Sequence, residues 1–430
     1  MIYFILFLGL ILRLVSLNQS LWLDEATTAL ASQMLIPDFF TKFMSADFHP
    51  PLYYLVIHYW TLLFGTSEIV LRFPSVIFGV GTIYVVYIIA KDLKFKNALV
   101  PALFLATSGL HVYYSQEARM YSMVTFLASY SILLFLRKKW LVFSFVLPLL
   151  FLTDYLALII LPVLVIYVLI FERKYLKNIL AAVVPLGFTF VLWIPTFFQQ
   201  LENGFTLKEG ASGWWNILGI VTYKNIALIP TKFMIGRISF DNKYLYFALI
   251  VSIFIVFIFQ ILKSRNKLIW LWFLLSLVLG IFLSFFIPTL TYFRYLFILP
   301  AFYLLVSETI SKRIILLILA LNLVSTSLYL FNTKYHREDW RGVAKLIGNE
   351  RIVFPANSQK EALIYYGKGE SIISKGELTN REENIWLSRY VWEIFDSNDS
   401  TRKYIENLGY NKTTDANLNG ILVFKYARRN

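Results

Sequence analysis

The feature that most limits the fold of this chain is a series of long apolar runs separated by short basic segments. Runs such as 244–262 and 268–288 exceed the roughly 18 apolar residues that mark a membrane span. The chain is 58% hydrophobic over 430 residues, whereas soluble domains are about 45–50% apolar. These runs predict an α-helical polytopic membrane protein.

Positive charge collects in short segments between the apolar runs. These segments are Lys91/Lys94/Lys96, Arg137/Lys138/Lys139, Arg173/Lys174/Lys177, Lys263/Arg265/Lys267 and Lys312/Arg313. Because Lys and Arg are enriched in cytoplasmic loops, the segments predict which side of the membrane each loop occupies. The net charge of +14 is accounted for largely by these loops, so we expect no nucleic-acid partner.

The charge pattern predicts about eleven transmembrane helices. They fall near residues 2–17, 70–90, 98–112, 118–136, 140–154, 156–171, 179–197, 243–262, 268–288, 294–308 and 314–331. The N-terminus is then cytoplasmic and the C-terminus extracytoplasmic, in a multi-pass protein of the plasma membrane.

Residues 50–64 are apolar and helical in pattern but short for a span. If they crossed the membrane, every later basic loop would change sides, so we expect a re-entrant or interfacial helix. Its aromatic residues fit an interfacial position; they are Tyr53, Tyr54, Tyr59 and Trp60. Short helices are expected at 24–35 and 38–46, and 198–242 is expected to be an outer loop with interfacial Trp214 and Trp215.

The chain divides into a transmembrane catalytic module, 1–331, and an extracytoplasmic domain, 332–430. The second part has no long apolar run and alternates between helical and extended patterns. Helices are predicted at 338–347, 360–366 and 401–408, and strands at 351–354, 385–391 and 421–426. This alternation predicts a small α/β domain. The chain has no Cys, which excludes disulfides and thiolate chemistry.

Several charged side chains fall at helix ends on the predicted outer face, where charge near lipid is costly unless it has a function. Asp24 and Glu25 directly follow the first span, although capping of the next helix would also explain them. The others are Arg13, Arg72, Arg119, Asp154 and Arg294. Charges from several helix ends on one side of the membrane indicate an active site at the interface.

This set of residues suits displacement at a sugar carbon with a phosphate leaving group. A carboxylate takes the proton from the attacking hydroxyl, and guanidinium groups stabilise the charge that grows on the phosphate. We expect Asp24 to be the base, and Arg119 with Arg72 or Arg294 to hold the phosphate. A hydrophobic slot among the spans would hold a polyprenyl tail.

Four motifs follow one another in the first third of the chain. They are Leu23-Asp24-Glu25, His49-Pro50-Pro51-Leu52, Leu71-Arg72-Phe73-Pro74-Ser75 and Tyr114-Ser115-Gln116-Glu117-Ala118-Arg119-Met120-Tyr121. In this order and spacing they resemble the GT-C membrane glycosyltransferases, above all the branch of the dolichyl-phosphate-mannose protein mannosyltransferases and aminoarabinose transferases (glycosyltransferase family 39-like). Residues 20–130 carry most of the resemblance, with later landmarks at 292–295 and 338–341.

The resemblance implies a GT-C fold and an inverting enzyme that uses a polyprenyl-phosphate monosaccharide on the extracytoplasmic side. It implies that Asp24 is the catalytic base with Glu25 beside it, and that His49 lies at the donor or acceptor site. Arg72 and Arg119 are then near the donor phosphate. The remaining substrate-binding candidates are Tyr114, Glu117, Tyr121, Asp154 and Arg294.

The chain also departs from its relatives. The large central sugar-binding domain of the eukaryotic mannosyltransferases has no counterpart, because 198–242 is too short to contain it. The aminoarabinose branch has a Lys near the two prolines, where this chain has His49. The sequence therefore does not identify the sugar that is transferred, and the acceptor can be a glycan, a lipid or a protein.

Structural explanations compete with several of these roles. Arg119 could snorkel to the interface, Arg72 could pair with Glu68 at helical spacing, and Asp154 could cap a helix. Arg13 is expected to snorkel or to pair with an outer-loop carboxylate rather than to contact substrate.

Histidines and carboxylates on the predicted outer face could also bind a metal ion. His49 and His111 share one face without forming a tight ligand cluster, and a divalent cation at Asp24 or Glu25 is compatible with the resemblance.

Two other functions stay open. A ligase or polymerase would keep the fold but use a diphosphate-linked oligosaccharide donor. A lipid-sugar transporter would be expected to have internal repeats and broken helices around a midplane site.

Overall fold

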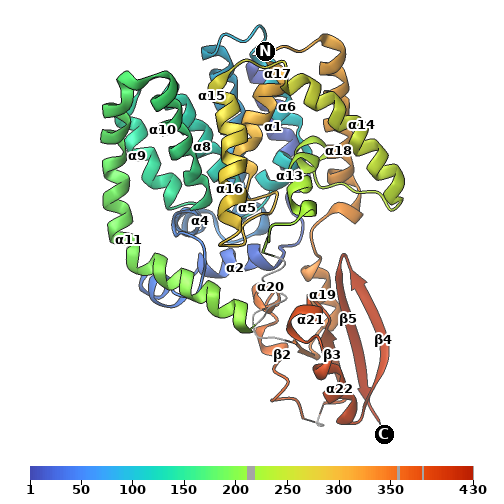
Figure 1. The fold of residues 1–430 in the computed structure, drawn as a ribbon. Coiled ribbons are helices and arrows are strands. Elements are labelled where there is room, and N and C mark those ends of the chain that lie inside the picture. The colour runs from blue at the N-terminus through green and yellow to red at the C-terminus, as the bar shows by residue number, and fades with distance from the viewer. Residues whose placement is uncertain (211–217, 356–358, 380–381, 430) are drawn as a thin grey trace.

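The computed structural model describes residues 1–210, 218–355, 359–379 and 382–429. It contains a bundle of long helices and a small domain built around a sheet, which lies at one end of the bundle beneath α2 (Figure 1). The fold prediction, a helical membrane protein with a small C-terminal α/β domain, is confirmed.

Each predicted span coincides with helical structure. The bundle contains α1 (Ile2–Leu14), α5 (Glu68–Asp92), α6 (Leu99–Thr107), α7 (Gly109–Ser115), α8 (Tyr121–Leu136), α9 (Trp140–Phe151), α10 (Ile160–Phe171), α11 (Leu176–Gly210), α14 (Lys243–Ile261), α15 (Lys267–Trp270), α16 (Ser276–Ser284), α17 (Leu299–Ser307) and α18 (Lys312–Phe331). Within the described residues, 5 helices are long and apolar enough to cross a membrane by length and composition. The count of eleven spans stays a prediction.

A break between α6 and α7 is held by Arg13 from α1. The guanidinium is fully buried and donates to the carbonyls of Ala106 (3.1 Å) and Leu105 (3.3 Å), and Nη2 lies 2.6 Å from Nδ1 of His111. Carbonyls at a helix end need such donors. The expectation that Arg13 snorkels or pairs with a carboxylate is therefore wrong.

The segment between α1 and α5 contains α2 (Leu23–Ala31), α3 (Ile36–Asp38), the π-helical turn η1 (Phe39–Phe43) and α4 (Leu52–Phe64). An interfacial position does not fit Tyr53 and Tyr54, because both are buried and hydrogen-bonded. The Tyr53 hydroxyl lies 2.8 Å from Oγ of Ser75. Tyr59 and Leu63, by contrast, are exposed on α4.

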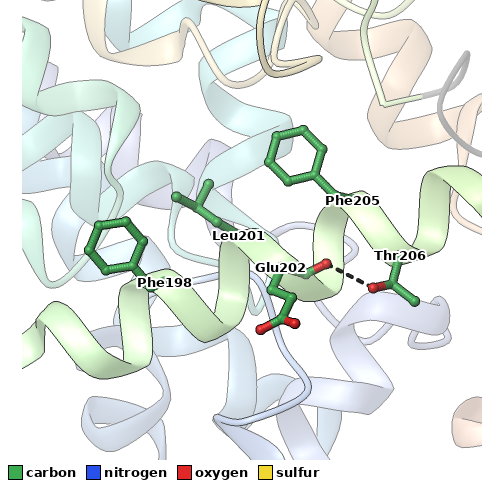
Figure 2. A pocket seen from close by; sticks show the side chains of 5 residues that line it. All are labelled: Phe198, Leu201, Glu202, Phe205 and Thr206. Carbon is green, nitrogen blue, oxygen red and sulfur yellow. Dashed lines mark hydrogen bonds between the residues drawn. The ribbon is translucent and has the colours of Figure 1, made fainter.

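Helix α11 does not end near residue 197 but continues to Gly210, and α13 (Tyr223–Ile235) follows. The prediction of one loop over 198–242 is therefore wrong. Figure 2 shows the reason in the sequence: Phe198, Leu201 and Phe205 lie on one side of the helix, and Glu202 and Thr206 on the other. Apolar residues at this spacing form the stripe of an amphipathic helix. Trp214 and Trp215 lie outside the described residues.

The C-terminal domain contains α19 (Trp340–Ile347), β1 (Arg351–Val353), α20 (Glu361–Tyr365), β2 (Ile372–Ile373), β3 (Asn384–Ser388), α21 (Trp392–Phe395), α22 (Ser400–Asn407), β4 (Tyr410–Leu418) and β5 (Ile421–Arg428). The strand order is β2-β1-β3-β5-β4. Strand β1 pairs in parallel with β2 and β3, and β5 is antiparallel to β3 and β4. Every predicted helix and strand of this domain is present, whereas β2 and β4 were not predicted.

The C-terminal domain is bonded directly to the segment around α2. Helix α20 packs against α2, and the Tyr366 hydroxyl accepts from the backbone N–H of Leu21 at 2.8 Å. The Tyr365 hydroxyl donates to the carbonyl of Thr66 at 2.8 Å, and Arg341 pairs with Glu68 at 2.7 Å. The domain therefore forms one wall around the N-terminus of α2.

Candidate active site

Asp24 lies in the first turn of α2, with Trp22 as the N-cap residue. Its side chain is 38% exposed, and its one ion pair, Oδ2 to Nη2 of Arg119, is 3.8 Å long. The Asp24 carboxylate does not cap α2, because the helix has no side-chain cap hydrogen bond. Asp24 therefore combines access to solvent with a nearby cation.

Arg119 connects Asp24 to the loop before α4. Its Nη1 donates to the Tyr54 hydroxyl at 3.1 Å, and its Nη2 lies 3.3 Å from Nε2 of His49. The guanidinium is 3% exposed and its Nε has no partner. Three residues predicted from separate motifs, Asp24, His49 and Arg119, are thus brought together.

Asp47 completes this group and was not predicted. It accepts from the Tyr54 hydroxyl at 2.8 Å, and its Oδ1 lies 3.4 Å from Nδ1 of His49. Burial opposes ionisation of Asp47, but His49, Arg119 and Tyr54 outweigh burial and lower its pKa to about 2. Asp47 is therefore ionised at neutral pH, and its carboxylate orients Tyr54 and His49.

Glu25, the next residue of α2, points in a different direction around the helix and is fully buried. Arg72 donates to both carboxylate oxygens, at 2.8 and 2.5 Å, and the N–H of Ala118 donates to Oε1 at 2.8 Å. Burial raises the pKa of Glu25, but Arg72 and Arg337 reverse this and hold it below its ordinary value. A carboxylate with so many partners has little freedom to contact a substrate.

Arg72 has five N–H donors and five acceptors. Besides Glu25, these acceptors are the carbonyls of Leu17, Gln19 and Ser20. An arginine with every donor bonded has none left for a phosphate. The geometry therefore disfavours the predicted substrate contact of Arg72, which pairs with Glu25 and not with Glu68.

Arg337, directly before the 338–341 landmark, enters the same buried group from the C-terminal side. Its Nε lies 3.4 Å from Glu25, and its Nη2 lies 3.3 Å from Glu117. Burial raises the pKa of Glu117, with Arg337 opposing it. Oε1 of Glu117 is buried without a partner. Glu117 thus has more unused hydrogen-bonding capacity than Glu25.

Two further arginines lie near this group without a carboxylate partner among the described residues. Arg237 is exposed and rests on the ring of Tyr113, with its Cζ 4.2 Å from the ring centroid. Arg294 is partly buried and makes no side-chain hydrogen bond or ion pair within the described ranges. Cations with free donors are the groups that a phosphate would bind.

Aromatic side chains fill the space between these arginines. Tyr114 and Tyr121 contact at 5.3 Å between ring centroids, and both contact Phe293, at 6.0 and 5.2 Å. Arg237 interacts electrostatically with Tyr114, and Arg294 with Tyr121. The structure thus groups the predicted residues Tyr114, Tyr121 and Arg294 on one side of the site.

Asp154 lies in the turn after α9 and accepts from the N–H of Leu156 at 2.8 Å. This hydrogen bond is the capping contact expected from the structural explanation of Asp154. Burial raises the pKa of Asp154, and the nearby charges of Arg294 and His49 lower it. Asp154 therefore caps a turn and also lies within electrostatic reach of the site.

The side chains give little support to the two metal sites considered from the sequence, one at His49 and His111 and one at Asp24 or Glu25. Across the described ranges no three His, Asp or Glu residues are grouped as metal ligands. His111 contacts Arg13, whereas His49 contacts Asp47 and Arg119. The divalent cation stays a prediction.

An apolar pocket of about 280 Å³ opens beside the group around Asp47. Its lining residues are Phe40, Pro51, Leu55, Leu152, Thr189, Leu192 and Trp193. A second pocket, of about 510 Å³, lies along α11 and is lined by the residues of Figure 2. Of these two pockets, the one of about 280 Å³ lies next to the His49-Pro50-Pro51 motif, because Pro51 is part of its lining.

Three functional candidates were missed from sequence: Asp47, Arg237 and Arg337. Asp47 stands two residues before His49 and could have been included with that motif. Arg337 precedes the landmark at 338–341. Arg237 carries no motif, and its only signal is a position after Gly236, whose φ of 66° ends α13.

Solved structures share this architecture. The chain resembles ArnT from Cupriavidus metallidurans in the apo state, with a TM-score of 0.60 and 12% identity over 98% of this chain and 97% of that one. With ArnT bound to undecaprenyl phosphate the TM-score is 0.57, at 13% identity and the same coverage. The Archaeoglobus fulgidus oligosaccharyltransferase in its apo form gives 0.50, at 11% identity over 84% and 63% of the two chains. The fold is therefore that of the GT-C membrane glycosyltransferases.

A family match narrows this class. Residues 48–197 match the family described as dolichyl-phosphate-mannose-protein mannosyltransferase. No curated protein sequence matches the chain. The fold and the family match together indicate that this multi-pass membrane protein is a glycosyltransferase.

Proposed function

We propose that the protein transfers one sugar from a polyprenyl-phosphate carrier to an acceptor hydroxyl on the extracytoplasmic face of the membrane, with inversion at the anomeric carbon. The observation that carries this proposal is the difference between two adjacent carboxylates. Asp24 is 38% exposed beside Arg119, whereas Glu25 is fully enclosed by Arg72, Arg337 and the N–H of Ala118. Only Asp24 is free to act on a substrate.

Asp24 acts as general base. The acceptor oxygen forms a bond to the anomeric carbon while the bond from that carbon to the phosphate oxygen breaks. The acceptor proton passes to Asp24, and the electron pair of the broken bond leaves with the polyprenyl phosphate. Attack opposite to the leaving group inverts the anomeric centre.

The leaving phosphate gains negative charge, so it needs cations that are not already neutralised. Arg237 and Arg294 fit this role because neither has a carboxylate partner within the described residues. Arg119 lies between Asp24 and His49, so its positive charge can act both on the base and on a substrate bound beside His49. Arg72 instead holds Glu25 and the backbone of 17–20, which positions α2 and therefore Asp24.

The pocket beside Pro51 supports a lipid-linked donor. It is almost wholly apolar in lining and lies next to the His49 motif. A polyprenyl chain is apolar along its length, so it can occupy this lining without leaving a polar group buried against hydrocarbon. ArnT has been solved with undecaprenyl phosphate bound, and the matching family is described by dolichyl-phosphate-mannose. Both names support a polyprenyl monophosphate over a diphosphate-linked oligosaccharide.

Replacement of Asp24 tests the proposal. We expect Asp24→Asn to lower the turnover number by at least about 100-fold, the usual contribution of a general base. Binding of undecaprenyl-phosphate mannose should stay within about twofold of wild type, measured by scintillation proximity. Glu377→Asn, a change at an exposed C-terminal carboxylate, is the control. Near-normal turnover in Asp24→Asn would remove Asp24 from the base role.

A further inference from the structure

Glu338 is fixed over the site by the residues on either side of it. The backbone N–H of Arg337 donates to Oε1 of Gln19 at 3.1 Å, and that of Arg341 donates to Oγ of Ser20 at 3.0 Å. Residues 18–20 lead directly into α2. The C-terminal segment that contains Glu338 is thus bonded to the segment that positions Asp24.

Within the described residues, the carboxylate of Glu338 is held by two neutral donors and pairs with no cation. Nε1 of Trp340 donates to Oε2 at 3.0 Å, and the Tyr390 hydroxyl donates to Oε1 at 2.8 Å. Each oxygen therefore keeps a lone pair. Two other partly buried glutamates each have a cation: Glu68 has Arg341, and Glu350 has Lys425.

The electrostatic neighbours of Glu338 are the two groups most important for the reaction. Burial raises the pKa of Glu338, the charge of Asp24 raises it further, and Arg237 lowers it. The charges of Asp24, the proposed base, and of Arg237, a proposed phosphate ligand, thus act on Glu338. Leaving a carboxylate in such a place without a cation is unfavourable for the free protein.

The start of α20 adds an unpaired polar atom on the same domain. Oε2 of Glu361 is buried without a partner, and the charge of Asp24 reaches it. Buried polar groups normally have partners, and within the described residues this oxygen of Glu361 has none, so it can accept a hydrogen bond from a polar ligand.

We propose that Glu338 binds the acceptor: it accepts a hydrogen bond from a second hydroxyl of a vicinal diol whose first hydroxyl attacks the donor. This inference rests on the proposed function and adds the class of acceptor. Two adjacent hydroxyls are present on a sugar, whereas a serine or threonine of a peptide offers one. The acceptor is therefore a glycan, and Glu338 exchanges no proton in the transfer, since Asp24 takes the proton of the attacking hydroxyl.

The test separates the acceptor step from the donor step. Purified full-length protein in detergent is given radiolabelled dolichyl-phosphate mannose. Three products are measured: free mannose from hydrolysis, mannose on methyl α-mannopyranoside, and mannose on a threonine-containing peptide. We expect wild type to use the methyl mannoside in preference to the peptide. We expect Glu338→Gln to raise the KM for the methyl mannoside at least tenfold while hydrolysis stays within twofold.

Two further variants sharpen the result. Glu350→Gln is the matched control, because Glu350 also accepts from a tryptophan indole, Nε1 of Trp386 at 2.5 Å, but has Lys425 as partner. It should leave all three products unchanged. Tyr390→Phe keeps the Glu338 carboxylate and removes one of its donors, so it should raise the same KM by about threefold; it also tests the inference if Glu338→Gln fails to fold.

The outcomes are distinct. A parallel loss of hydrolysis and transfer in Glu338→Gln would make Glu338 a structural residue, and preference for the peptide would assign a protein acceptor; either overturns the inference. Wild type that neither hydrolyses nor transfers from any of a panel of polyprenyl-phosphate monosaccharides, dolichyl-phosphate mannose among them, contradicts the proposed function and with it the role of Glu338.

Discussion

At the scale of single residues, Arg237, a proposed phosphate ligand, differs from the arginines that have structural partners. Arg72, Arg119 and Arg337 are all buried with protein partners, whereas Arg237 is exposed, rests on the face of Tyr113 and forms no side-chain hydrogen bond or ion pair within the described residues. A guanidinium with free donors can form charge-assisted hydrogen bonds to a phosphate. Its sequence position gave no hint of this, because no motif surrounds it.

We expect Arg237→Gln to raise the KM for the lipid-phosphate donor by about 10- to 100-fold, since a hydrogen bond to a charged group contributes about 1.5–3 kcal/mol. Turnover at saturating donor should fall less. Lys334→Gln is the control, because Lys334 is another exposed cation that pairs with Asp241 instead. Equal donor KM values for the two variants would exclude Arg237 from the phosphate site. Donor titrations of initial rate measure the difference.

Asp47 links stability to pH. Its pKa falls from an ordinary 3.8 to about 2 in the folded protein, which corresponds to about 2 kcal/mol of stability. Because the folded-state pKa is the lower one, this stability is fully present above pH of about 4 and is lost as the pH falls towards 2. Asp47→Asn should therefore be less stable than wild type by about 2 kcal/mol at pH 7.

The difference between Asp47→Asn and wild type should shrink as the pH is lowered from 4 to 3. Unfolding by denaturant in detergent micelles, followed by tryptophan fluorescence between pH 3 and 7, measures it. Asp38→Asn removes an exposed ion pair with Lys42 and should show little pH-dependent change. A difference for Asp47→Asn that does not vary with pH would contradict the assignment.

At the scale of elements, the far end of α11 positions the loop of residues 44–49. Nε2 of Gln200 donates to the carbonyls of Met44 (3.3 Å) and His49 (3.2 Å), and Asn203 donates to the carbonyl of Ser45. The Tyr155 hydroxyl donates to Oε1 of Gln200 at 2.8 Å. The polar face of α11 therefore fixes the loop that contains Asp47 and His49, and its apolar face is the stripe in Figure 2.

Gln200→Ala should lower turnover by about three- to tenfold without altering the fold, because it removes three hydrogen bonds worth about 0.5–1.5 kcal/mol each, two of them to the loop. Gln199→Ala is a matched control: the residue type is the same, but the side chain is exposed. Steady-state rates and thermal melting of both variants give the comparison. If Gln199→Ala lowers the rate as much, the loop is not positioned through Gln200.

The elements also show what sequence could predict. Hydropathy and basic loops located helical structure at every predicted span, because burial in lipid demands long apolar runs, but they missed α13 and the extension of α11 to Gly210. Strand β4 was missed because its composition, Tyr410–Leu418, is almost wholly polar; it lies at the sheet edge and pairs with β5 alone. Its signal was Asn419-Gly420, the preferred two-residue hairpin turn, in which both residues have positive φ, 47° and 96°.

At the scale of the whole molecule, Arg337 joins the two parts of the chain. It contacts Glu25 from α2, Glu117 from the turn after α7, and the Tyr329 hydroxyl at 2.9 Å in α18. The sequence motifs identified Asp24, His49 and Arg119 as neighbours within one module. They did not reveal that a residue about 300 positions later closes the same group, because such a contact depends on tertiary packing.

Arg337→Met should destabilise the protein by about 3–5 kcal/mol, since removing one partner leaves buried carboxylates without their cation. Thermal melting in detergent, followed by the loss of monodisperse protein on size exclusion, measures this. Adding Glu117→Gln to Arg337→Met should recover part of the stability, because the stranded charge is gone. A double variant less stable than Arg337→Met would show that the two residues do not form a coupled pair.

The late position of Arg337 also has a consequence for biosynthesis. Its partner Glu117 precedes it by 220 residues, which a ribosome adds in roughly 10–40 s at 5–20 residues per second. During that interval Glu25 and Glu117 have no cation from the C-terminal part of the chain. A nascent chain therefore cannot assemble this buried charge group until the last apolar helix, α18, has been made and Arg337 has followed it.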